Sequence, residues 1–302
     1  MFGPIFRFEI GFHRRQYLFY ILCGVFFLLT FLATTSPNVS MGPSFNNINI
    51  NAPIAVISTL ATLSILAIFG AVAFVASGVI RDFELKTAEF FLTTRVSKFD
   101  YIYGRFAGAL VFCFGIYFAG LLGVLLGEFA PWLDQERIGE VNLQAYWFAS
   151  WAIALPNLLV ASCIFFCLAT VTRSMMFTYV AAITLLMLTF VIGSFTEPET
   201  IDFTSKIEPF GLTALGEQVR YWTVFEKNDL IPIMEGNFLI NRVIWLGVGL
   251  FFLVLAYFLF PFSVENIRIS KRKTRQAKAL IDAEESRLPL DDHFNLPSVT
   301  TR

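Results

Sequence analysis

Hydrophobic residues along the chain are gathered into six long blocks, which polar segments separate. The blocks cover residues 17–35, 53–80, 105–127, 145–172, 175–195 and 243–264. A helix needs about 20 apolar residues to cross a hydrocarbon layer of about 30 Å. Each block therefore predicts one membrane-spanning helix, and the expected fold class is an all-α integral membrane protein with six transmembrane helices. Pro156 lies inside the fourth block and predicts a kink there.

The positive charges alternate between successive connecting segments. Arginine and lysine occur in segments 1–16, 81–104, 173–174 and 265–302, whereas segment 36–52 is uncharged and segments 128–144 and 196–241 lean acidic. Because positively charged loops stay in the cytoplasm, this pattern places both termini there. A signal peptide is disfavoured, since sixteen residues precede the first block and no small-x-small site follows it.

The expected organisation has three parts. Residues 1–16 form a cytoplasmic amphipathic segment, residues 17–264 form the six-span domain, and residues 265–302 form a charged cytoplasmic tail that is expected to be flexible. Segment 196–241 is expected to be a non-spanning outer segment between the fifth and sixth spans.

Composition supports a membrane location and excludes several kinds of function. Of the 302 residues, 56% are hydrophobic and 15% charged, against about 25% charged in soluble domains. The net charge of −1 gives no field for binding nucleic acid. Cys163 and Cys167 have helical i,i+4 spacing, but no histidine or carboxylate lies near them in the sequence. We therefore expect packing cysteines and no metal site.

Catalytic motifs are missing from the sequence. It contains no HExxH, GxSxG or Walker A motif, and its histidines are His13 and His293. The chain is thus not expected to be an enzyme, and any ATP would be bound by another polypeptide. The central parts of the blocks contain no Asp, Glu, Lys, Arg or His, which argues against ion-coupled transport and against a charged-ring channel.

Segment 81–98 predicts a short amphipathic helix on the cytoplasmic side. One face would carry Phe83, Thr87, Phe90, Phe91 and Thr94, with charged edges formed by Arg81, Glu84, Lys86, Glu89 and Lys98. Such a helix either lies on lipid or inserts into a groove of a cytoplasmic partner. Its mixed charge, rather than a purely basic face, favours the protein partner.

This part of the chain resembles a known family. The residues Arg81-Asp82-Phe83-Glu84, Thr87-Ala88-Glu89, Phe90-Phe91, Thr94-Arg95 and Gly104-Arg105-Phe106 resemble the loop after the second helix of ABC-2 type permeases. These permeases are the membrane subunits of one class of ATP-binding cassette exporters. The stretch 94–96 lacks the proline that is frequent in the family.

The resemblance implies partners and residue roles. It implies nucleotide-binding subunits that carry ATP and Mg²⁺, and a second permease subunit in a homo- or heterodimer. The roles expected for the segment are groove anchors (Phe90, Phe91), polar contacts (Glu84, Glu89), a residue on the same face (Thr87) and a junction with the span (Arg81, Asp82). The alternative role for Phe90 and Phe91 is packing beneath the bundle.

Two further features extend the interpretation. Glycines in and before the third span, including Gly104, Gly108, Gly123 and Gly127, predict close helix packing. In the outer segment, Glu208-Pro209-Phe210-Gly211, Tyr221-Trp222-Thr223, Gly236-Asn237 and Asn241-Arg242 resemble a subset of permeases associated with M1-type aminopeptidases.

The expected function is a permease subunit in a bacterial inner membrane. The alternative is a non-transporting scaffold or anchor for an aminopeptidase or a surface machine.

Overall fold

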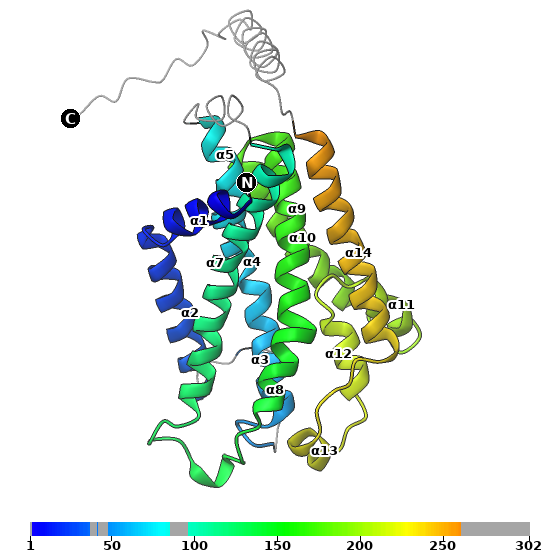
Figure 1. The fold of residues 1–302 in the computed structure, drawn as a ribbon. Helices are drawn as coiled ribbons and strands as arrows, with labels where there is room; N and C mark the ends of the chain where they lie inside the picture. The colour runs from blue at the N-terminus through cyan, green and yellow to red at the C-terminus, as the bar shows by residue number, and fades with distance from the viewer. Residues whose placement is uncertain (1, 37–40, 42–47, 85–95, 261–302) are drawn as a thin grey trace, which may run out of the picture. The chain divides into compact units, whose positions relative to one another are not determined.

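The described part of the chain is entirely helical. The computed structural model describes residues 2–36, 41, 48–84 and 96–260, and no strand occurs among them (Figure 1). The elements in chain order are α1 (Phe2–His13), α2 (Tyr17–Thr35), α3 (Pro53–Leu66), α4 (Ile68–Ala71), η1 (Val72–Ala76), α5 (Ser77–Glu84), α7 (Lys98–Gly127), η2 (Gln135–Arg137), α8 (Leu143–Phe148), η3 (Ala149–Ala154), α9 (Leu155–Thr172), α10 (Met175–Ser194), α11 (Ile201–Ile207), α12 (Leu212–Val219), α13 (Val224–Asp229) and α14 (Gly236–Leu259).

Six helical stretches are long and apolar enough to cross a membrane. They are Tyr17–Thr35, Pro53–Asp82, Lys98–Gly127, Leu143–Thr172, Met175–Ser194 and Gly236–Leu259. Each corresponds to one of the six blocks predicted from hydrophobicity. The prediction of an all-helical, multi-pass membrane protein is therefore confirmed at this level.

The ends of the spans differ from the predicted ones where polar residues continue a helix. The third span begins at Lys98 rather than at residue 105, because the Ser97 side chain accepts a hydrogen bond from Asp100 N and caps the helix. The sixth begins at Gly236 rather than at residue 243. Hydrophobicity identifies the apolar part of a helix, and these two helices extend beyond it by about two turns.

The second and fourth spans form the buried centre of the bundle. In each of them 78% of the most apolar stretch is buried, against 11% in α2 and in α10. Both central spans contain a π-helical turn, η1 in the second and η3 in the fourth. The turn η3 ends at Ala154, two residues before Pro156, the position of the predicted kink. Proline has no N–H to donate to the preceding turn, and the hydrogen bonding of that turn is rearranged.

The third span, α7, packs along both α1 and α2 through its glycines. A Cβ atom at Gly104 would lie 3.0 Å from Ile5 Cγ2, and one at Gly127 would lie 2.9 Å from Thr34 Cβ. A Cβ atom at Gly123 would collide with Thr30 Oγ1. The Thr30 hydroxyl donates to the Gly120 carbonyl at 2.7 Å, so the two backbones are held close by hydrogen bonding as well as by shape.

Helix α1 and the segment between α10 and α14 lie at opposite ends of the bundle. Helix α1 lies across the ends of α2 and α7, and α13 is at the other end (Figure 1). The helices α11, α12 and α13 have 7, 8 and 6 residues, which is too short to cross a membrane.

Candidate functional site: a buried charge cluster between α1, α5 and α7

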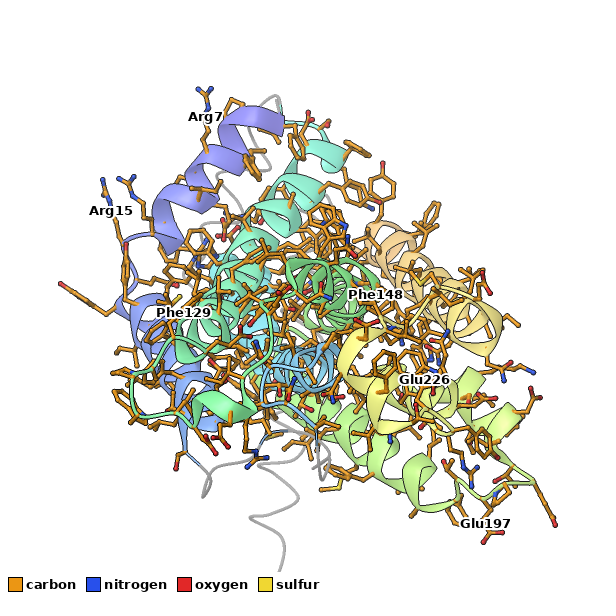
Figure 2. All side chains as sticks on the ribbon, turned by 90° about the horizontal axis from the view of Figure 1, so that it is seen from below. Arg7, Arg15, Phe129, Phe148, Glu197 and Glu226 are labelled. Carbon is orange, nitrogen blue, oxygen red and sulfur yellow. The ribbon has the colours of Figure 1, made fainter. Side chains whose placement is uncertain are left out.

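The face of α1 that packs against α7 is mixed, with both apolar and polar side chains. Ile5, Glu9 and His13 follow each other at intervals of four residues, and all three are buried. The arginines Arg7 and Arg15 lie on the other side and project outward (Figure 2). The phenylalanines of this segment alternate with a period of two, but the burial pattern has the period of a helix.

Glycines on two neighbouring helices make room for Glu9. A Cβ atom at Gly108 of α7 would lie 2.7 Å from Glu9 Cβ, and one at Gly78 of α5 would lie 3.1 Å from Glu9 Oε1. Both positions are therefore too close to Glu9 for an unshifted side chain. The missing side chains at these two glycines leave room for the Glu9 carboxylate in the interior between α1, α5 and α7.

Two guanidinium groups and one imidazole ring surround the Glu9 carboxylate. Arg105 Nη1 lies 2.7 Å from Glu9 Oε2, and Arg81 Nη2 lies 3.1 Å from the same oxygen. On the other side, His13 Nε2 lies 2.9 Å from Glu9 Oε1. Arg81 belongs to α5 and Arg105 to α7, so a single carboxylate of α1 contacts both spans.

A second carboxylate, that of Asp82, completes the arrangement. Arg105 Nη2 lies 2.5 Å from Asp82 Oδ2, and the Tyr101 hydroxyl donates a hydrogen bond to the same oxygen. Arg105 therefore bridges Asp82 and Glu9. We refer to Glu9, His13, Arg81, Asp82, Tyr101 and Arg105 as the charge cluster.

The formal charges of the two carboxylates and the two guanidinium groups balance. Glu9 is 0% exposed and Arg105 1%, so each charge depends on its partners rather than on water. Burial raises the pKa of Glu9. The hydrogen bond to His13 and the charges of Arg105 and Arg81 outweigh this effect, so the pKa lies below its ordinary value. Removing one partner from such a buried pair costs about 3–5 kcal/mol.

The structure brings together some of the predicted site residues. Arg81 and Asp82 lie in the charge cluster, at the end of the second span. Thr87, Glu89, Phe90 and Phe91 lie outside the described residues, as does the side chain of Glu84. Of the predicted packing glycines, Gly104 and Gly108 face α1, whereas Gly123 and Gly127 face α2.

Sequence reasoning did not assign the other members of the cluster to a site. In the sequence, Glu9 and His13 belong to the amphipathic segment, Tyr101 is an aromatic residue at the inner membrane edge, and Arg105 is a motif residue at the edge of a hydrophobic block. One signal was available. Glu9 is the single acid in the basic segment 1–16, and His13 lies one helical turn after it.

A second buried polar network lies toward the other end of the bundle. Arg242 of α14 is 2% exposed, and its Nη1 donates to Asn157 Oδ1 at 2.8 Å. Asn157 Nδ2 in turn donates to Ser64 Oγ at 2.9 Å. Three spans are thus joined by side chains in the interior of the bundle.

The same network holds the segment between the fifth and sixth spans. Asn241 Nδ2 donates to the carbonyls of Ser205 and Glu208, at 2.7 and 2.8 Å. The Glu208 carboxylate accepts from Phe210 N at 2.9 Å. Gly211 has a φ of +73°, and a side chain there would collide with Arg242. The motifs quoted from 208–211 and 241–242 therefore meet in space.

No metal-binding constellation occurs among the residues that the structure describes. No group of three or more His, Cys, Asp or Glu side chains there is placed to hold a metal ion. In comparisons with known proteins, no family model matches the chain, and no curated protein matches it.

Proposed function

We propose that this chain is the membrane-spanning permease subunit of an ATP-binding cassette exporter in a bacterial inner membrane. It would work with a second permease subunit and with separate nucleotide-binding subunits, which supply ATP and Mg²⁺. The charge cluster is the observation that carries the proposal. It joins α1, the end of the second span and the start of the third span, at the end of the bundle that the arginine and lysine pattern assigns to the cytosol.

The cluster lies next to the segment through which a bound ATPase would move the bundle. Arg81 and Asp82 begin segment 81–98, the predicted contact with the ATPase, and lie at the end of the second span. A displacement of that segment would reach Glu9 and Arg105 through ion pairs that are costly to break. ATP binding would then favour one state of the permease through its different contacts with segment 81–98 in the two states.

The first experiment identifies the partner. Affinity purification of the full chain in mild detergent, followed by identification of bound chains, should recover a protein with a Walker A loop. The same sample shows whether an M1-type aminopeptidase is bound. Recovery of a peptidase without any ATPase would favour the scaffold over the exporter.

The second experiment tests the contact. Phe90→Asp combined with Phe91→Asp should abolish copurification of the ATPase, because two charges would enter an apolar groove. The matched control is Phe225→Asp on α13, where the phenylalanine is exposed and at the opposite end of the bundle. Equal copurification of the double variant and the control would remove the coupling assignment.

The third experiment separates transmission from binding. In the reconstituted complex, Arg81→Gln should keep the ATPase bound but reduce substrate-stimulated ATP hydrolysis several-fold, because the ion pair with Glu9 is lost. A scaffold would show no substrate stimulation even in the unmodified complex.

A further inference from the structure

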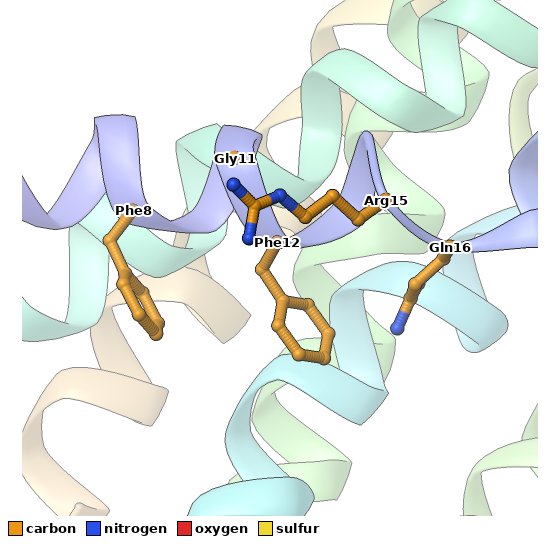
Figure 3. A pocket seen from close by; sticks show the side chains of 5 residues that line it. All are labelled: Phe8, Gly11, Phe12, Arg15 and Gln16. Atoms are coloured by element: carbon orange, nitrogen blue, oxygen red, sulfur yellow. The ribbon is translucent and has the colours of Figure 1, made fainter.

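An open groove lies along α1 near the start of α2. The groove has a volume of about 440 Å³ and is lined by Phe8, Gly11, Phe12, Arg15 and Gln16 (Figure 3). A Cβ atom at Gly11 would meet nothing within 4 Å, so the middle of the groove is open space. None of these residues belongs to the charge cluster.

The groove combines an apolar surface with a cationic group. The Arg15 side chain runs back along α1, and its guanidinium group lies beside Gly11 and Phe12 (Figure 3). The Arg81 guanidinium lies 3.6 Å from the centre of the Phe12 ring, which helps to fix that ring in place. The site can therefore offer a positive charge and aromatic surface to a single ligand.

The exposed charged side chains of residues 2–16 are all positive. Arg7, Arg14 and Arg15 are exposed, and none forms an ion pair with another described residue. Glu9, the single acid of segment 1–16, is buried in the charge cluster. The complementary ligand is therefore an anion.

The location of the groove selects the kind of anion. Gln16 is followed directly by the first span, α2, which begins at Tyr17. The groove thus lies at the level where lipid headgroups meet acyl chains. A free inorganic anion would not use the phenylalanines, and a neutral lipid would not use the arginines.

We propose that this groove binds an anionic phospholipid of the cytosolic leaflet. The phosphate would pair with Arg15, supported by the neighbouring Arg14, and the upper acyl chain would cover Phe8 and Phe12. Because the Phe12 ring of the groove also lies against the Arg81 guanidinium of the charge cluster, the bound lipid would hold α1 against the bundle.

The test is a titration of the full chain in detergent with phosphatidylglycerol or phosphatidylcholine, read by native mass spectrometry. The expected result is preferential retention of phosphatidylglycerol. Arg15→Gln should weaken that retention about fivefold. Gly11→Leu fills the groove without changing any charge, and it should weaken retention at least as much.

The matched control is Arg7→Gln, which removes the same charge from the same N-terminal segment but outside the groove (Figure 2). It should change retention less than twofold. A loss as large as that of Arg15→Gln, together with unchanged binding in Gly11→Leu, would show only general surface attraction and would overturn the proposal. Displacement of phosphatidylglycerol by millimolar inorganic phosphate would identify a free anion site and would overturn it too.

Discussion

The strongest expectation concerns the replacement of Glu9 by glutamine. Glu9→Gln keeps the size of the side chain but removes the charge that lies 2.7 Å from Arg105 Nη1 and 3.1 Å from Arg81 Nη2. Breaking a buried pair in this way costs about 3–5 kcal/mol. The substitution should mainly weaken the packing of α1 against the bundle, because Glu9 is the acidic group that connects this helix to both spans.

Hydrogen exchange of the α1 amides measures that docking directly. Each 1.4 kcal/mol corresponds to a factor of ten, so a cost of about 3–5 kcal/mol predicts exchange that is about 10² to 4 × 10³ times faster over Phe2–His13. Exchange in α9, at the centre of the bundle, should change much less. The acceleration cannot exceed the protection that α1 has in the unmodified protein, and that protection is set by the smaller of two free energies, that of undocking α1 and that of global unfolding.

The control is Glu140→Gln, the same chemical change at an exposed acid. It should leave α1 exchange unchanged. If Glu9→Gln behaved like this control, the ion pairs would contribute nothing to α1 docking, and apolar contacts such as those of Ile5 would have to account for it.

Three further outcomes follow from the geometry. Gly123→Ala should lower stability by about 1–3 kcal/mol in thermal unfolding because α2 and α7 must separate; Gly247→Ala, where a Cβ meets nothing within 4 Å, should not. Arg242→Met should lower the unfolding midpoint, since buried acceptors lose their donor at about 1–3 kcal/mol each; an unchanged midpoint would show that water replaces it. The lowered pKa of Glu9 means that its contribution is complete above the ordinary value of 4.5 and is lost as the pH falls through the lowered pKa. Unfolding midpoints should therefore fall below that pH more steeply in the unmodified protein than in Glu9→Gln.

The six spans could be predicted from the sequence because the membrane imposes a simple requirement on each of them. About 20 consecutive apolar residues are needed whatever the neighbours are. The helix ends were less predictable, since the cap at Ser97 and the polar residues after it extend α7 without changing its hydrophobic block.

The charge cluster was only partly predictable, for a different physical reason. Its members come from positions 9, 13, 81, 82, 101 and 105, so its formation depends on which helices become neighbours. Arg81 and Asp82 were selected through a resemblance. Nothing periodic in the sequence connects them with Glu9, and the glycines that admit Glu9 are also common in ordinary membrane helices.

The π-helical turns η1 and η3 bear on how the buried centre can move. A π-turn accommodates one residue more than an α-helical turn, and one residue corresponds to about 100° of helical rotation. If such a turn shifted by a single position, the residue passed over would turn to a different neighbour while the hydrogen bonds on either side stayed intact. Each central span contains one such turn, so a shift of the turn along the helix would rotate one half of the span without unwinding the other half.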